Sequence, residues 1–313
     1  MTSYAFGIGV LTVTIVCTGT AAWSQAPKLK DIEQCNASDH TPPDLQISGC
    51  TAVIESTTRT PQMLAVAYNN RGNAHFKTGN YDQALQDYDR SIKINPSYAK
   101  AFNNRGVGYR LKGDYDRAIA DYNQAIKLNA KFASAYNNRG VAYDKKGEYD
   151  RAILDYDQAI KLRPSAEGYF NRGNAQLGKA HYDRAIDDYN QAIKLKADFA
   201  AAFDNRCWAR AVVGILKQAL ADCNEALRLM PNNAATLDSR GFVFLKMTHF
   251  DAAVSDYDAA LRINPKLAFA LYGRGLARLK NEDPSGEADI AAAKTLQADI
   301  AEEYARYGMQ ETR

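Results

Sequence analysis

The chain has 313 residues, of which 46% are hydrophobic and 24% are charged. This composition is typical of a folded protein and excludes wholesale disorder. Its 39 basic and 36 acidic residues leave a formal net charge of only +3. Such a small charge provides neither the basic stripe of a nucleic-acid-binding protein nor a polybasic patch for an anionic membrane.

The first 25 residues contain no charged side chain. An apolar stretch from Ala5 to Cys17 precedes a small-residue segment, so residues 1–25 are predicted to be a signal peptide with Ala22 and Ser24 at its cleavage site. This predicts an exported protein, periplasmic or secreted. An uncleaved membrane anchor over residues 4–23 and an ordinary cytosolic N-terminus are the alternatives. The anchor would be the only expected contact with a membrane.

Four cysteines follow this segment, and an even number fits an oxidising compartment. Cys35 and Cys50 enclose a short loop with two prolines, which a disulfide would stabilise by about 3 kcal/mol in the chain-entropy model. We expect this bond to pin an N-terminal cap over residues 26–64 with one helix, at 44–58. Because no CxxC or histidine pair accompanies the cysteines, we expect no metal site.

Residues 65–301 repeat a unit of about 34 residues, which is the sequence signature of a repeat fold. The tripeptide Asn-Arg-Gly recurs at Asn70, Asn104, Asn138 and Asn171, in steps of 34, 34 and 33 residues. Within each unit, aromatic and small residues at helical spacing precede a turn, and a second face of Ala, Ile and Tyr follows it. Proline commonly ends the unit. The pattern predicts a helix–turn–helix in every repeat.

The residues at fixed offsets in each unit resemble the tetratricopeptide repeat family. In the first unit these residues are Tyr68, Gly72, Tyr81, Ala84, Tyr88, Ser91 and Pro96. Six good repeats occupy 65–98, 99–132, 133–165, 166–199, 200–233 and 234–267, and a degenerate seventh occupies 268–301. The resemblance implies an all-α, right-handed superhelix of antiparallel helix pairs with a concave groove. We expect 302–313 to be a C-terminal capping segment, within a polar-faced terminal helix over 295–313.

Each repeat carries an arginine where the family usually has an aliphatic residue, and an aspartate follows about sixteen positions later. The turn lies at the midpoint of each pair, so an antiparallel hairpin brings the two side chains together. The predicted structural ion pairs are Arg71–Asp87, Arg105–Asp121, Arg139–Asp155, Arg172–Asp188, Arg206–Asp222 and Arg240–Asp256, with Arg274 and Asp289 one residue closer in sequence. A row of arginines that binds an acidic ligand is the alternative.

The same symmetry places Cys207 opposite Cys223, and Cys207 occupies a position that is glycine in most other repeats. Helices approach most closely at such a position, which suits a disulfide. Two inert buried thiols are the alternative, because a buried cysteine also behaves as a small apolar residue.

The candidate binding residues are five asparagines that precede the arginines, namely Asn70, Asn104, Asn138, Asn171 and Asn205. They resemble the asparagine ladder in the repeat superhelix of the O-linked N-acetylglucosamine transferase, which implies contact with the backbone of an extended peptide. An amide offers both a donor and an acceptor for that purpose. The alternative is that these amides solvate the groove or bond neighbouring helices. Trp208 is a candidate aromatic contact in the same groove.

The sequence therefore predicts a non-enzymatic scaffold that binds an extended peptide or protein segment in its concave groove. Catalytic, phosphate-binding and dinucleotide-binding motifs are missing, so we expect no catalytic residue, no cofactor and no small-molecule substrate. The alternative function is a structural subunit of a cell-envelope assembly that docks through its convex face or its caps. A cytosolic adaptor is a third possibility, against which the number of cysteines argues.

Overall fold

The computed structural model describes residues 26–36 and 41–310, and the predicted signal peptide lies outside them. Regular secondary structure in the described residues is entirely helical. The helices are α1 (Leu29–Asn36), α2 (Pro43–Glu55), α3 (Pro61–Lys77), α4 (Tyr81–Ile94), α5 (Ala99–Leu111), α6 (Tyr115–Leu128), α7 (Ala133–Lys145), α8 (Tyr149–Leu162), α9 (Ala166–Gly178), α10 (Tyr182–Leu195), α11 (Ala200–Val212), α12 (Leu216–Leu229), α13 (Ala234–Lys246), α14 (Phe250–Ile263), α15 (Ala268–Lys280), α16 (Gly286–Leu296) and α17 (Ile300–Arg306).

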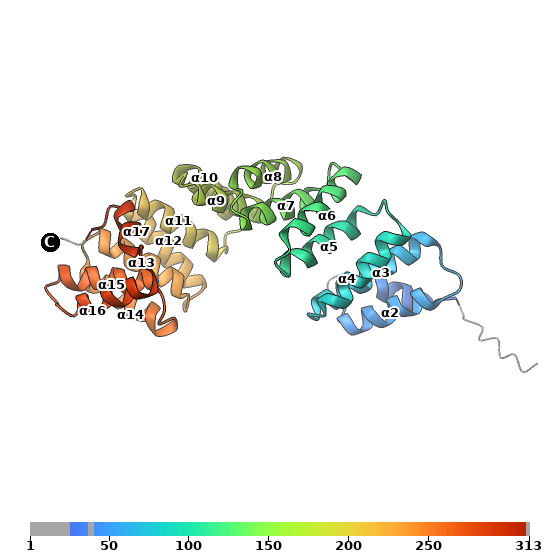
Figure 1. Ribbon diagram of the computed structural model, residues 1–313, viewed down its shortest axis with the longest axis horizontal. Helices are drawn as coiled ribbons and strands as arrows, with labels where there is room; N and C mark the ends of the chain where they lie inside the picture. Colours follow the sequence, from blue (N-terminus) through green and yellow to red (C-terminus); the bar gives the residue numbers. More distant parts are fainter. Residues whose placement is uncertain (1–25, 37–40, 311–313) are drawn as a thin grey trace, which may run out of the picture.

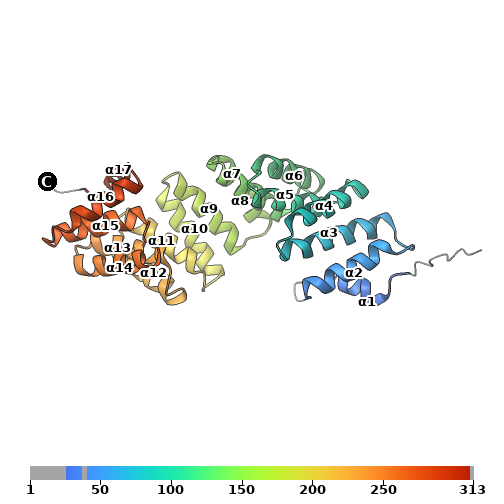
Figure 2. The ribbon, with the colours of Figure 1, turned by 60° about the horizontal axis from the view of Figure 1, so that its bottom comes forward.

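The helices form an elongated all-α solenoid (Figures 1 and 2). From α3 to α16, each first helix packs against the second helix of its own pair, and that second helix packs against the next first helix. Successive pairs are therefore stacked in chain order, as the repeat pattern predicts. The predicted fold class is confirmed.

A residue with positive φ ends the turn that follows each first helix. In the third pair it is Gly147, with φ of 75°, a backbone conformation that glycine adopts without steric cost. The fourth turn uses Ala180 at φ of 57° instead. The second helices α4, α8, α12 and α14 end two residues before a proline, as α8 does at Leu162 before Pro164, because proline cannot continue a helix.

In five of the repeats the two helices cross closely where a glycine of the first helix meets a tyrosine of the second. A Cβ atom on Gly140 would lie 2.7 Å from Cε1 of Tyr156, which is only 1% exposed. The same contact recurs at Gly72–Tyr88, Gly106–Tyr122, Gly173–Tyr189 and Gly241–Tyr257. These buried aromatic rings form the repeating core of the solenoid.

The N-terminal cap has two helices before the first repeat, so the expectation of one helix was wrong. The short helix α1 packs against α2 and α3. Cys35 at its end is joined to Cys50 of α2, with Cα atoms 4.4 Å apart. An isolated eight-residue helix is marginal in water, so α1 depends on packing and on this bond. The apolar pattern of α1 is too short to have identified it as a helix from the sequence.

The C-terminal end also differs from the sequence prediction of one helix over 295–313. Helix α16 continues to Leu296, and α17 begins at Ile300 and ends at Arg306. The expected polar cap instead buries Ile300 and Tyr304 completely. The turn between α16 and α17 brings Ile300 and Tyr304 into the core of the last repeats, and their burial stabilises it.

Candidate peptide-binding groove

The first helices of the repeats line the inner side of the solenoid. Consecutive first helices contact one another from α3 to α15, whereas consecutive second helices do not contact one another in the described residues. Helices on the inside of a curve lie closer together than those on the outside. The concave surface is therefore built from α3, α5, α7, α9, α11, α13 and α15.

The predicted asparagine ladder lies at the boundaries between repeats, and each Nδ2 donates to the unit before it. Asn104 donates to Oδ1 of Asn69 at 3.0 Å, and Asn138 donates to Oδ1 of Asn103 at 3.0 Å. The other donors are Asn70 to the Cys35 carbonyl, Asn171 to Asn137 and Asn205 to Asn174. The amides thus connect neighbouring helices, which is one of the two roles that the sequence left open.

Part of the hydrogen-bonding capacity of the ladder is not used by these contacts. Asn138 and Asn171 are only half-buried. Their Oδ1 atoms accept no hydrogen bond from the described part of the chain, and each Nδ2 has a second N–H. A single amide can therefore join two repeats and still present an acceptor and a donor to a bound segment.

Ladder asparagines also line two polar cavities. One of about 390 Å³ lies at the N-terminal end, where Asn70, Asn73, Phe76 and Asn104 are among its lining residues. Another of about 250 Å³ lies between the third and fourth repeats. Its lining residues include Ser134, Asn137, Asn138, Arg163 and Glu167. The open part of the groove is thus rich in amide groups, together with hydroxyl and charged side chains.

The arginine of every repeat contacts the aspartate predicted to lie opposite it. In the third repeat, Nε and Nη2 of Arg139 donate to Oδ2 and Oδ1 of Asp155 at 2.8 and 2.6 Å. The hydrogen bond that Arg139 donates to Asp155 raises the pKa of Arg139, and the aspartate side chain is 7% exposed. Corresponding contacts join Arg71 to Asp87, Arg105 to Asp121, Arg172 to Asp188, Arg206 to Asp222, Arg240 to Asp256 and Arg274 to Asp289.

Each arginine has a further partner that the sequence analysis missed. Nη1 of Arg139 donates to Oδ1 of Asn123, on the second helix of the preceding repeat, at 2.6 Å. The corresponding acceptors are Thr51, Asp89, Asp157, Asn190, Asn224 and Asp258. The signal was present as the Asp or Asn that directly follows the second-helix tyrosine in most units. These arginines therefore join repeats as well as the two helices of one repeat.

Both predicted cysteine pairs are disulfides in the structure. The Cα atoms of Cys207 and Cys223 are 5.4 Å apart. The pair stands where other repeats have their glycine and tyrosine, at the closest approach of the two helices. The disulfide replaces that buried contact in the fifth repeat.

Trp208 lies on the concave side, yet the chain's own C-terminal segment covers it. Its ring centroid is 5.2 Å from that of Tyr307, 4.9 Å from Phe242 and 5.1 Å from Phe269. The candidate aromatic contact is therefore half-buried in a cluster with its own partners.

Two features are absent from the described residues, a helix able to span a membrane and a cluster of metal-ligating side chains. None of the helices there has both the length and the apolar content to cross a membrane. The same residues contain no group of three or more His, Cys, Asp or Glu side chains arranged to hold a metal ion.

The repeat geometry agrees with direct sequence matches. Models of the tetratricopeptide repeat match residues 65–98, 133–165, 166–199 and 240–303, and a further TPR repeat model matches 108–147. Together they cover more than half of the chain. The chain belongs to the tetratricopeptide repeat family. Members of this family are typically non-catalytic, and the protein is a protein–protein interaction scaffold.

Solved tetratricopeptide structures share this fold at low sequence identity. YrrB, described as having an unusual peptide-binding site, is 21% identical, with a TM-score of 0.53 over 61% of this chain and all of its own. PilF of Pseudomonas aeruginosa is 19% identical, with a TM-score of 0.60 over 66% of this chain and 94% of its own. The Cut9–Hcn1 complex gives 17% identity and a TM-score of 0.63 over 79% of this chain and 50% of the matched chain.

A curated relative from Drosophila melanogaster is a DNA polymerase interacting tetratricopeptide repeat protein of 47 kDa. It is 42% identical over 56 residues, which are 18% of this chain and 14% of the relative. The match thus spans about one seventh of that protein's length.

Proposed function

We propose that this scaffold binds an extended polypeptide segment in the concave groove of its first four repeats. The single observation that carries the proposal is the ladder of half-buried amides on the inner face, of which Asn138 and Asn171 have an unused acceptor. Amides at the repeat period suit the backbone of a bound segment, because a peptide unit offers N–H and C=O regardless of its side chain. The peptide-binding site described for YrrB, which shares this fold, is consistent with such a role.

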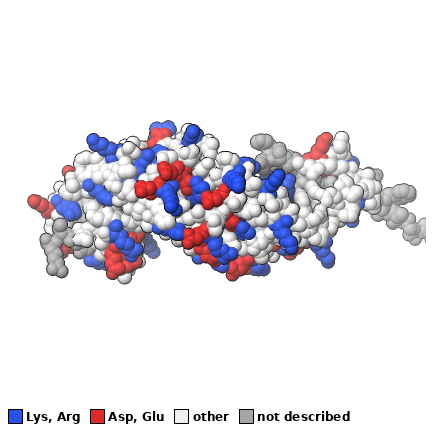
Figure 3. Space-filling model, turned by 90° about the horizontal axis from the view of Figure 1, so that it is seen from above, with Lys and Arg blue, Asp and Glu red and all other residues white. Residues whose placement is uncertain are grey.

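The surface charge fits a segment recognised through its backbone rather than through its net charge. Figure 3 shows basic and acidic side chains interspersed on one face of the molecule. The arginines of the repeats are also held by their own acidic partners. We therefore expect binding to weaken only modestly between low and physiological salt, because screening acts mainly on exposed charges.

The test begins with selection of twelve-residue peptides against the full chain from a random display library. An Asn138→Ala/Asn171→Ala variant should bind the selected peptides at least about ten-fold more weakly, the loss expected for one or two hydrogen bonds. Methylation of alternate peptide backbone nitrogens should weaken binding more than most alanine substitutions in the peptide.

Gln158→Ala is the matched control, because Gln158 is exposed on the second helix α8. Circular dichroism and melting temperature verify the fold of both variants. Unchanged peptide affinity in a folded double-asparagine variant would refute the proposal and direct attention to the convex face and the caps.

We also propose that the protein is exported to an oxidising compartment. The two disulfides support this, since such bonds persist outside the reducing cytosol. N-terminal sequencing of the protein from its native source, with alkylation of free thiols, tests the proposal. An intact residue 1–25 segment together with alkylation of Cys35, Cys50, Cys207 and Cys223 would contradict it.

A further inference from the structure

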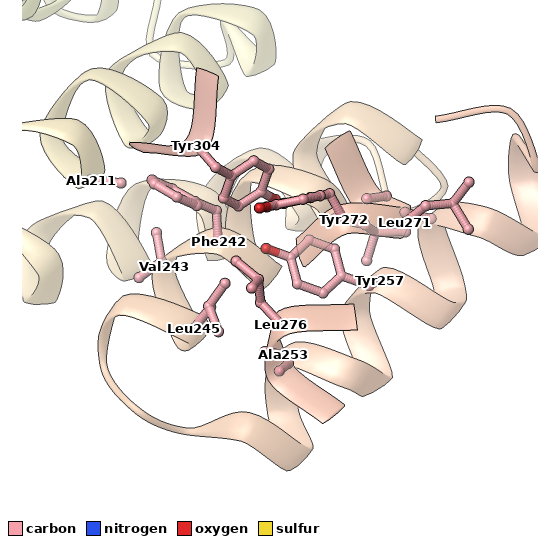
Figure 4. Close-up of a cluster of buried hydrophobic side chains, with 14 of the residues drawn as sticks. Ala211, Phe242, Val243, Leu245, Ala253, Tyr257, Leu271, Tyr272, Leu276 and Tyr304 are labelled. Carbon is pink, nitrogen blue, oxygen red and sulfur yellow. The ribbon is translucent and has the colours of Figure 1, made fainter. Parts of the chain in front are cut away.

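The last helix of the chain crosses the concave face of the final repeats. Tyr304 of α17 stacks on Phe269 of α15, with ring centroids 4.1 Å apart, and Tyr307 reaches Trp208 of α11 at 5.2 Å. Figure 4 shows Tyr304 inserted beside Phe242 and Tyr272. Helix α17 thus reaches back over three repeats, whereas the next helix of a regular stack contacts only its neighbours.

The surface beneath α17 is aromatic in a way that the earlier repeats are not. Trp208, Phe242 and Phe269 come from three consecutive first helices, and the centroids of Phe242 and Phe269 are 5.8 Å apart. We call these three residues the aromatic surface. The positions equivalent to Trp208 and Phe242 in the first four repeats are Asn73, Val107, Val141 and Asn174.

Few polar contacts fix α17 to this surface. It has seven residues, too few to be helical in water without packing. Nε2 of Gln297, at the end of the last repeat, donates to Oε2 of Glu303 at 2.8 Å. Tyr304 Oη donates to the Phe269 carbonyl at 2.9 Å, and Nζ of Lys246 donates to the Tyr307 carbonyl at 3.2 Å. Docking of α17 therefore depends mainly on the burial of Ile300 and Tyr304.

Two carboxyl groups next to the aromatic surface are incompletely satisfied while α17 covers it. Oδ1 of Asp204 and Oδ1 of Asp238 are buried and accept no hydrogen bond from the described residues, although Ser239 and Thr236 form hydrogen bonds with the Asp204 carboxyl group. Both aspartates are on first helices, one position before the ladder position. Burial raises the pKa of Asp238 to about 8, and Asp204 contributes to the same shift. Burying the Asp238 carboxyl without a hydrogen-bond donor is costly, and a cation beside it would offset part of that cost.

We propose that the aromatic surface is a docking site for an amphipathic helix of a partner protein. The partner helix carries two aromatic side chains three residues apart and an arginine or lysine beside them. Helix α17 is the intramolecular occupant that it displaces. Tyr304 of α17 and Tyr307 directly after it supply the aromatic part of this chemistry. Helix α17 places no hydrogen-bond donor on Oδ1 of Asp204 or Asp238, and the partner helix supplies that donor. This site is separate from the asparagine groove and does not depend on it.

The test uses two synthetic peptides with the sequence of residues 297–313, carrying Ala301→Arg or Ala301→Gln. Residue 301 is one turn before Tyr304 and therefore on the same helix face. The receptor is the full chain with Tyr307→Ala, which weakens the intramolecular contact. We expect the arginine peptide to bind it at least about ten-fold more tightly than the glutamine peptide, as coupled charge pairs at interfaces do. Asp204→Asn/Asp238→Asn in the receptor should abolish the difference.

Hydrogen exchange on the wild-type chain gives a readout that does not depend on the Tyr307 variant. The arginine peptide should increase exchange of the amides of residues 300–309, because it displaces α17. Equal affinity of the two peptides for the Tyr307→Ala chain would overturn the proposal. Binding to wild type without faster exchange of 300–309 would overturn it too, since the peptide would then occupy another surface.

Discussion

Loss of the arginine from one repeat tests whether the Arg–Asp pairs hold the solenoid together. In Arg139→Ala, Asp155 keeps its place on α8 but loses both hydrogen bonds from the guanidinium. The aspartate side chain is only 7% exposed, compared with 20% for the arginine. Water therefore cannot replace the lost donors without local opening of the helix pair. The contact of Arg139 with Asn123 of the preceding repeat is lost as well.

Stranding one member of a buried ion pair typically costs about 3–5 kcal/mol. Each kcal/mol shifts the melting temperature by roughly 2–4 °C for chains of 150–250 residues and by less for longer ones, so at about 2 °C per kcal/mol this chain should lose about 6–10 °C. Replacing both partners, in Arg139→Leu/Asp155→Leu, should cost less than the sum of the single changes, because no uncompensated charge remains.

Thermal unfolding followed by circular dichroism provides the measurement, with Lys112→Ala as the control. Lys112 contacts Asp82 at 2.6 Å, but the two side chains are 47% and 80% exposed. Exposed pairs contribute about 0–1 kcal/mol. If Arg139→Ala shifted the melting temperature no more than Lys112→Ala does, the reasoning from burial would be refuted.

Three further changes test the core, the disulfide and the buried acid. Gly140→Ala should destabilise the chain by about 1–3 kcal/mol in urea unfolding, because its Cβ would lie 2.7 Å from Cε1 of Tyr156; a neutral effect would contradict the close crossing. Cys207→Ser/Cys223→Ser should lose about 3 kcal/mol of stability relative to the oxidised wild type, and a melting temperature equal to that of the wild type would show that the bond adds nothing. Desolvation and the nearby Asp204 raise the pKa of Asp238 from 3.8 to about 8, so between these values the folded chain holds a proton that the unfolded chain has released. The free energy of unfolding should therefore fall as pH rises through this range, by at most about 1.4 kcal/mol per pH unit, and level off above pH 8. Urea midpoints measured across this pH range should fall less steeply for Asp238→Asn than for the wild type. An equally steep fall in the two proteins would contradict the prediction. The groups that face Asp238 are Asp204 of α11, Tyr257 of α14 and Tyr304 of α17.

Contacts within a repeat were predictable from the sequence because the two helices of a hairpin meet symmetrically about their turn. Residues sixteen positions apart, such as Arg139 and Asp155 or Cys207 and Cys223, lie opposite each other whenever the turn lies midway between them. Repetition of the unit then fixes the order of stacking, since each hairpin has an apolar face that only its neighbours can cover.

Contacts between neighbouring repeats could not be predicted in the same way, because several arrangements of two hairpins are compatible with the sequence. Asn138 donates a hydrogen bond to Asn103 of the preceding repeat. The distance between these two side chains depends on how two neighbouring hairpins are rotated against each other. The sequence predicts an amide at this point but not the direction in which it donates.

The C-terminal helix is the clearest case. Its pattern of residues fits a cap on the last repeat, and only the tertiary structure brings Tyr307 to Trp208, almost one hundred residues earlier in the chain. Helix α17 is too short to have a stable conformation of its own, so burial of its aromatic rings decides where it lies. The sequence by itself determined the solenoid, its ion pairs and the pairing of Cys207 with Cys223, because these follow from the periodicity of the repeat. The tertiary structure alone decided which part of the groove is covered, because that depends on where α17 buries the most apolar surface.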